Sequence, residues 1–308
     1  APGSAIERLV YVGDTPMNDG TAFANICRAG DWPGLAFIGA DRDQPAKVKI
    51  SEGEGRTLYV ANRWAAIADF AGLCRERGFA LDERAAVIVD LDKTAVGARG
   101  RNDQVIDRAR VEAVRRTVGS LLGDDFNPGG FQQAYDLLNQ LEFHPFTADN
   151  QDYLAYICLI LGTGLYHLEP LAADVQAGNL TSFQQFIAQV DARAGELPAT
   201  LREIHEGVYD LVQQGDPTPF KAFRYNEYDT TVQAMGFLGD DAPVEDLLAR
   251  EIVVTQEIRE LALDWRDQGA LLFGLSDKPD EASVPRPDRA AEGSQPIHRA
   301  RTHAVGKA

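Results

Sequence analysis

The sequence has few cysteines, no long apolar run and too few basic residues to balance its acidic ones. Its three cysteines, Cys27, Cys74 and Cys158, lie far apart and form no Cys-x-x-Cys pair. Such a set predicts buried free thiols and argues against a disulfide framework or a cysteine metal site. No apolar segment is long enough to span a bilayer and no signal-peptide pattern is visible, so we expect a cytoplasmic protein.

The charge balance excludes two classes of partner. Lys and Arg together number 30 and Asp and Glu 47, which gives a formal net charge of −17. This charge repels nucleic acids and anionic lipid surfaces, so we expect neither as a partner. A small anionic substrate is still compatible, because a metal ion and a few basic residues can override the global field locally.

The order of elements predicts an α/β protein of about two domains, given a length of 308 residues. Apolar strand-like runs at 9–12, 35–39, 58–61, 87–89 and 270–276 alternate early with helical segments, which favours a parallel sheet. From about 103 to 268 the pattern follows a helical period instead. We therefore predict an α/β core formed by 1–98 and 268–308, and an inserted all-α domain at 99–267.

The strand at 87–89 ends in two carboxylates one residue apart, Asp90 and Asp92, followed by Thr94. Paired acids at a buried strand end need a compensating partner, and a divalent cation is one. One such carboxylate can attack a phosphorus centre while the other protonates the leaving group. The alternative is an acidic surface turn.

Two further strand ends carry polar groups. Asp14 and Asp19 follow the first strand after Gly13 and could ligate magnesium, although a Gly-Asp turn can also simply begin a helix. Ser276 follows the last apolar strand, which is a common position for a serine.

Taken together, these motifs resemble the haloacid dehalogenase-like (HAD) superfamily of phosphohydrolases and phosphotransferases, over residues 5–95 and 268–308. The resemblance implies a Rossmann-like core in which Asp90 attacks phosphorus and binds Mg²⁺ and Asp92 is the general acid and base. It also implies that Asp92 (through its backbone carbonyl), Asp14 and Asp19 contribute to the metal site. The phosphoryl group would be bound by Thr94, Ser276 and Lys307, with Lys278, Arg8 and Arg301 as other candidates for the cation. The family usually has glycine where this chain has Lys93.

The motif order differs from the family, because the Gly-Asp turn precedes the Asp-x-Asp strand. A circular permutation explains this within one chain, and a swap between subunits of a homodimer is the other explanation. In either case Asp14 must lie beside Asp90.

In the family, a domain inserted after the Asp-x-Asp strand is a cap that closes over the active site. The linker into it carries Arg99 and Arg101, which are candidate substrate contacts or part of a solvated linker. His205 and Arg224 are among the candidate substrate contacts inside the inserted domain, and a structural role is the alternative for each. The resemblance implies a Mg²⁺-dependent phosphatase of small phosphorylated metabolites. A phosphotransferase or phosphomutase, and a non-catalytic binding protein, are the alternatives.

Overall fold

The computed structural model describes residues 5–306, and these divide into two compact units. The first, here the α/β unit, comprises the described residues 5–108, Thr231–Lys278 and 300–306. The second, the helical unit, comprises Ala109–Thr230 and Pro279–Arg299. The two are considered separately below.

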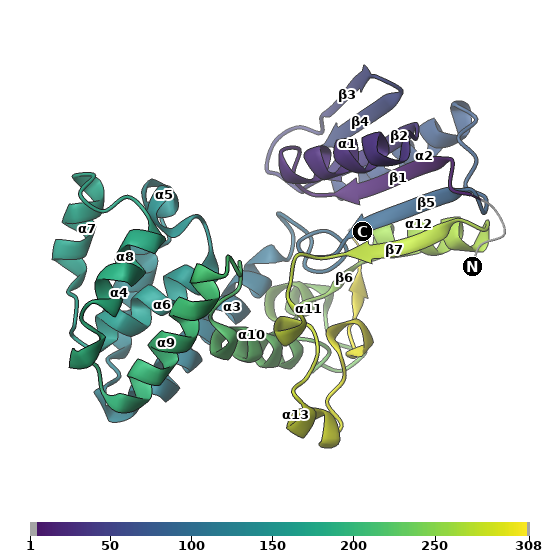
Figure 1. Ribbon diagram of the computed structural model, residues 1–308. Coiled ribbons are helices and arrows are strands. Elements are labelled where there is room, and N and C mark those ends of the chain that lie inside the picture. Colours follow the sequence, from purple (N-terminus) through teal and green to yellow (C-terminus); the bar gives the residue numbers. More distant parts are fainter. Residues whose placement is uncertain (1–4, 307–308) are drawn as a thin grey trace. The chain divides into compact units, whose positions relative to one another are not determined.

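The α/β unit is built on a six-stranded sheet of order β3-β4-β2-β1-β5-β7 (Figure 1). All neighbouring strands are parallel except β3 and β4. The strands are β1 (Arg8–Gly13), β2 (Gly34–Gly39), β3 (Val48–Gly53), β4 (Arg56–Ala61), β5 (Ala85–Asp90) and β7 (Leu271–Leu275). The central strands β1 and β2 are almost wholly buried, as their continuous apolar sequences predict.

Helices cover both faces of this sheet (Figure 1). Phe23 and Cys27 of α1 (Asn18–Gly30) pack on the face that carries Leu9 and Tyr11. Helices α2 (Ile67–Glu76) and α12 (Gln256–Asp267) cover the opposite face, where Phe70 and Trp265 meet edge to face. The result is the three-layer arrangement expected of an α/β core.

The sheet is mixed, and not wholly parallel as the sequence suggested, because β3 was not predicted. Every residue of β3 is exposed and its sequence VKISEG has little apolar character. Its turn into β4 places Glu54 and Gly55 at φ 51° and 73°. Two positive φ values define the tight hairpin that joins antiparallel strands.

The chain reverses its direction across the sheet at β1. It passes from β1 to β2 on one side, and returns through α2 to β5 on the other side of β1. In open α/β sheets, ligands bind at the carboxyl ends of the strands that flank such a reversal. The connectivity therefore singles out the ends of β1 and β5.

The rest of the α/β unit contains elements that the sequence assigned to the inserted domain. These elements are helix α11 (Val244–Arg250), strand β6 (Val254–Thr255) and α12, and β6 pairs in parallel with β8 (Ala304–Val305), which the sequence had placed in the core. One continuous helical pattern over 244–265 is thus interrupted by a strand. Residues 231–267 belong to the α/β unit and 279–299 to the helical unit, so the unit boundaries differ from the expected ones. Periodicity identifies the apolar face of a helix but not the surface that it covers.

The helical unit packs around α6 (Gln151–Gly162), whose residues from Asp152 to Ile160 are all buried. Around it lie α4 (Pro128–Leu138), α5 (His144–Thr147), α7 (Leu168–Gln176), α8 (Phe183–Asp191) and α9 (Ala199–Gln213). The short α13 (Pro287–Ala291) also belongs to this unit. Two helices, α3 (Asp103–Leu122) and α10 (Lys221–Gln233), have residues in both units.

Two expectations from composition can be checked directly. All three cysteines are free and buried, and burial raises the pKa of the Cys27 and Cys74 thiols, to about 11 and about 12. Among residues 5–306, no helix combines the length and the apolar character needed to cross a membrane.

Candidate metal centre and phosphate site

Three parallel strands deliver the predicted site residues to one edge of the sheet. Val12 of β1 is the register partner of Val89 of β5, so Asp14 and Asp90 emerge next to each other. Asp90 in turn is the register partner of Leu275, the residue before Ser276. This is the edge that the chain reversal at β1 marks as a binding site.

The carboxylates of Asp14, Asp19 and Asp90 come together here. One oxygen from each lies within 4.8 Å of the others. Asp14 and Asp19 are each only 7% exposed. Because β1 and β5 pair within one chain, the convergence of Asp14 and Asp90 needs no second subunit.

Asp19 is held at the start of α1 by four donors. Its Oδ2 accepts hydrogen bonds from the backbone N–H of Asp14 (3.0 Å) and from the N–H and hydroxyl of Thr15 (2.7 and 3.0 Å). Its Oδ1 accepts one from the hydroxyl of Tyr11 (3.0 Å). The side chain fits because residue 13 is glycine: a Cβ there would lie 2.4 Å from the Cγ of Asp19.

Crowding of acids in a buried place changes their proton affinity. Burial raises the pKa of Asp90 to about 8, and the nearby charges of Asp19, Asp14 and Asp92 add to the rise. Burial likewise raises the pKa of Asp14 to about 6, although Arg99 opposes the rise. The cluster therefore carries more negative charge than its surroundings neutralise.

Of the two linker arginines, only Arg99 reaches the cluster. Its Nε donates to Oδ2 of Asp14. In residues 5–306 no other basic side chain pairs with the three acids. Arg101 is instead enclosed by carboxylates, with bonds of 2.9 Å to Asp41 and to both oxygens of Glu257.

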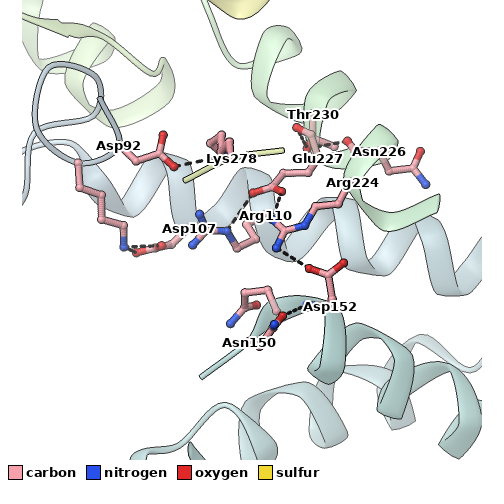
Figure 2. Close-up of polar contacts among 12 residues, drawn as sticks. Asp92, Asp107, Arg110, Asn150, Asp152, Arg224, Asn226, Glu227, Thr230 and Lys278 are labelled. Carbon is pink, nitrogen blue, oxygen red and sulfur yellow. Dashed lines mark hydrogen bonds and ion pairs between the residues drawn. The ribbon is translucent and has the colours of Figure 1, made fainter. Parts of the chain in front are cut away.

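Asp92 lies outside the three-acid cluster and is paired with a lysine. Its Oδ2 is 3.5 Å from Nζ of Lys278, whose side chain is 8% exposed (Figure 2). Lys278 also donates its backbone N–H to the hydroxyl of Ser276 (3.1 Å). The turn after β7 thus supplies a serine and a lysine together, while Thr94 is buried in the turn after β5.

Among the described candidates for the phosphate-site cation, Lys278 is the one at this edge. Arg8 begins β1, at the opposite end of the strand, and pairs with Glu7 and Asp82. Arg301 pairs with Asp240. Lys307 lies outside the described residues. The segment before it, 296–305, contains the short strand β8 and a 3₁₀ turn, Ile297–Arg299.

The donor set suits a hard divalent cation. Carboxylate oxygens are the ligands that Mg²⁺ takes, and Mg²⁺ needs only a few from the protein because it keeps several waters. Asp14, Asp19 and Asp90 would hold it, since each has an oxygen facing the others and their shared charge lacks a full counterion.

The candidates inside the helical unit are held by internal contacts. His205 is 1% exposed and bonds through Nδ1 to the hydroxyl of Tyr156 at 2.5 Å. Arg224 lies between Asp152 and Glu227, and Arg110 bonds the other oxygen of Glu227 at 3.2 Å (Figure 2). Sequence patterns gave no sign of this buried network, because its members are separated along the chain.

Comparison with known proteins adds no identification. A scan against protein-family models, a search of curated proteins and a search of solved structures each found no match.

Proposed function

We propose that the protein is a magnesium-dependent phosphatase that acts on a small phosphorylated metabolite through an aspartyl-phosphate on Asp90. The observation that carries the proposal is the convergence of Asp14, Asp19 and Asp90 at the ends of adjacent parallel strands. An Asp-x-Asp pair and a Ser–Lys turn lie on neighbouring strand ends. The permuted HAD-like arrangement inferred from the sequence is part of the same proposal.

In the first half of the reaction, a carboxylate oxygen of Asp90 attacks phosphorus and the bond from phosphorus to the leaving oxygen breaks. Asp92, in its acid form, gives its proton to that oxygen. Ser276 and Thr94 orient the phosphoryl oxygens, and Lys278 offsets their negative charge. Mg²⁺, when bound, supplies positive charge at the phosphoryl oxygens.

In the second half, Asp92 takes a proton from a water molecule. The water oxygen attacks phosphorus and the bond between phosphorus and Asp90 breaks, which releases inorganic phosphate and restores both side chains. Lys278, 3.5 Å from Asp92, lies close enough to offset charge on the phosphoryl group in this step as in the first.

Hydrolysis of p-nitrophenyl phosphate with Mg²⁺ tests the proposal. The Asp90→Asn variant should lose activity by at least about a thousandfold, because no nucleophile replaces the lost carboxylate. The matched control is Asp69→Asn, which makes the same change at an exposed position on α2 and should keep full activity. Circular dichroism would show that both variants are folded.

Mass spectrometry of the rapidly quenched wild-type enzyme provides a second measurement. It should find one added phosphoryl group on the peptide that contains Asp90. Full activity in Asp90→Asn, or activity that withstands complete chelation of divalent metal, would refute the proposal. Transfer of the phosphoryl group to an added alcohol in preference to water would instead identify a phosphotransferase.

A further inference from the structure

A cavity of about 320 Å³ adjoins the candidate metal centre in the α/β unit. Asp14 forms part of its wall, together with Ile38 and Gly39 from the end of β2 and Val60 and Ala61 from the end of β4. The volume is within the lower range of small-molecule pockets. Any substrate bound at Asp14 has this cavity beside it.

The cavity is lined by three basic side chains, Arg42, Lys47 and Lys49. Over residues 5–306 none of the three side chains forms an ion pair or a hydrogen bond. Arg101 and Arg224, by contrast, are held by carboxylates. A group of unpaired cations around one cavity is suited to an anionic ligand.

The loop that carries two of these cations is fixed by its neighbours. Arg63 donates to the carbonyl oxygens of Arg42 and Gln44. The side chain of Asn62 accepts from the N–H of Lys47 (2.6 Å) and donates to the carbonyl of Pro45 (2.9 Å). The backbone therefore does not have to be ordered when a ligand binds, which lowers the cost of binding.

The sheet register sets the scale of the ligand. Gly13, Ile38, Val60 and Lys49 are successive register partners across β1, β2, β4 and β3. Three strand spacings place the backbone of Lys49 about 14 Å from that of Gly13. Because a lysine side chain is long, its ammonium group can lie closer to Gly13 than its backbone does. The remaining distance is comparable to the length of a small metabolite.

We propose that this cavity binds a second anionic group of the substrate, a phosphate or a carboxylate, at the end away from the phosphate that is cleaved. The inference rests on the proposed function and specifies its substrate class: small metabolites with two anionic ends. Lys47 and Lys49 would select the substrate and take no part in bond breaking.

Two pairs of substrates, each differing in the second anion, test this. Fructose 1,6-bisphosphate is compared with fructose 6-phosphate for a second phosphate, and 3-phosphoglycerate with glycerol 3-phosphate for a carboxylate. In at least one pair, we expect kcat/KM to be at least about tenfold higher for the doubly anionic member. Charge-assisted hydrogen bonds to the second anion are strong enough to give a difference of this size. The pair that shows the preference identifies the anion.

The double variant Lys47→Gln/Lys49→Gln should abolish this preference. It should leave hydrolysis of p-nitrophenyl phosphate unchanged, because that substrate has no second anion. The control Arg75→Gln/Arg259→Gln removes the same charge from exposed positions on α2 and α12, and should keep the preference. Equal kcat/KM within both pairs, or a preference that survives the double variant, would overturn the inference.

Measurements of ligand affinity distinguish failure of this inference from failure of the proposed function. If the wild-type protein does not cleave p-nitrophenyl phosphate, the phosphatase proposal fails. Calorimetric titration with the same four compounds then tests the cavity alone. At least about tenfold tighter binding of a doubly anionic compound, lost in Lys47→Gln/Lys49→Gln, would support the cavity as an anion site, and equal affinities would reject it.

Discussion

The two units bury acidic side chains in opposite ways. In the helical unit, Asp152 and Glu227 are 0% and 1% exposed, and Arg224 and Arg110 bind them in alternation. In the α/β unit, Asp14, Asp19 and Asp90 face one another, and Arg99 contacts only the first. The acids of the first, balanced cluster are matched by arginines, whereas those of the second, unbalanced cluster have excess negative charge that favours an added cation. The comparison separates an internal structural network from a candidate site.

The largest expected effect is in the balanced cluster. Asp152→Asn should lower the free energy of unfolding of the helical unit by about 3 kcal/mol, because Arg224 loses a buried partner. Urea unfolding followed by circular dichroism measures this. The control Asp210→Asn changes an exposed position on α9 and should have little effect. Equal stability of the two variants would contradict the structural role of the network.

The unbalanced cluster should make metal-free protein less stable as the pH rises. A folded-state pKa of about 8 for Asp90 means that between pH 4 and pH 8 the folded chain keeps a proton that the unfolded chain has lost. Because Asp14 and Asp152 have pKa values of about 6, the interval from pH 6 to pH 8 reports mainly on Asp90. We expect a loss of roughly 2 kcal/mol across that interval in the presence of EDTA.

Two comparisons isolate the cause of that pH dependence. Asp90→Asn should flatten it, since the variant has no proton to lose at that position. Saturating Mg²⁺ should raise stability more at pH 8 than at pH 6, because binding favours the ionised acids. A wild-type profile that is already flat in EDTA would count against the crowding of charge described here.

A smaller effect is expected at Gly13, where the backbone passes close to Asp19. Gly13→Ala should destabilise the protein by about 1 to 2 kcal/mol, since the new methyl group overlaps the carboxyl carbon of Asp19. Mg²⁺ affinity, measured by calorimetry, should fall in the same variant. Gly72→Ala, on α2, is the control, because a Cβ there would meet only the Arg75 side chain at an ordinary 3.9 Å. Unchanged Mg²⁺ affinity in Gly13→Ala would remove Asp19 from the proposed ligand set.

The smallest effect concerns Lys93, which has φ 60° in the turn after β5. Glycine adopts this conformation freely, so Lys93→Gly should be about 1 kcal/mol more stable than Lys93→Ala. Both variants lose the ion pair to Asp107, which cancels in the comparison. Thermal unfolding of the two variants side by side gives the difference. An alanine variant as stable as the glycine variant would show that the turn is not strained.

The strands of the α/β unit could largely be predicted from the sequence because buried parallel strands have continuous apolar runs. The same runs predicted that Asp14, Asp90 and Ser276 lie at strand ends, since each comes one or two residues after the last apolar residue of a strand. The strand β3 was missed because all its residues are exposed and only Val48 and Ile50 are apolar. Placement of α12 on the sheet was missed because its apolar stripe of Ile258, Ala262 and Trp265 would suit a helical bundle equally well.

The side-chain partners could not be predicted in the same way. Lys278 was one of several candidate cations, and only the pairing of β5 with β7 brings it to Asp92. The unpaired cations Arg42, Lys47 and Lys49 form no motif, since sequence alone does not tell which lysines lack a partner. The metal centre, the phosphatase activity and the cap role of the helical unit stay predictions.

The pairing of β5 with β7 also affects how the protein is made. Ala86 and Leu271 are register partners, yet Ala109–Thr230, the larger segment of the helical unit, lies between them in the chain. During synthesis the first five strands can emerge and associate long before β7 leaves the ribosome. Asp14 and Asp90 therefore have the opportunity to meet early, while Ser276 and Lys278 arrive only after the intervening helices have been translated. A nascent chain halted before residue 271 would hold three acids without the lysine and serine that complete the edge.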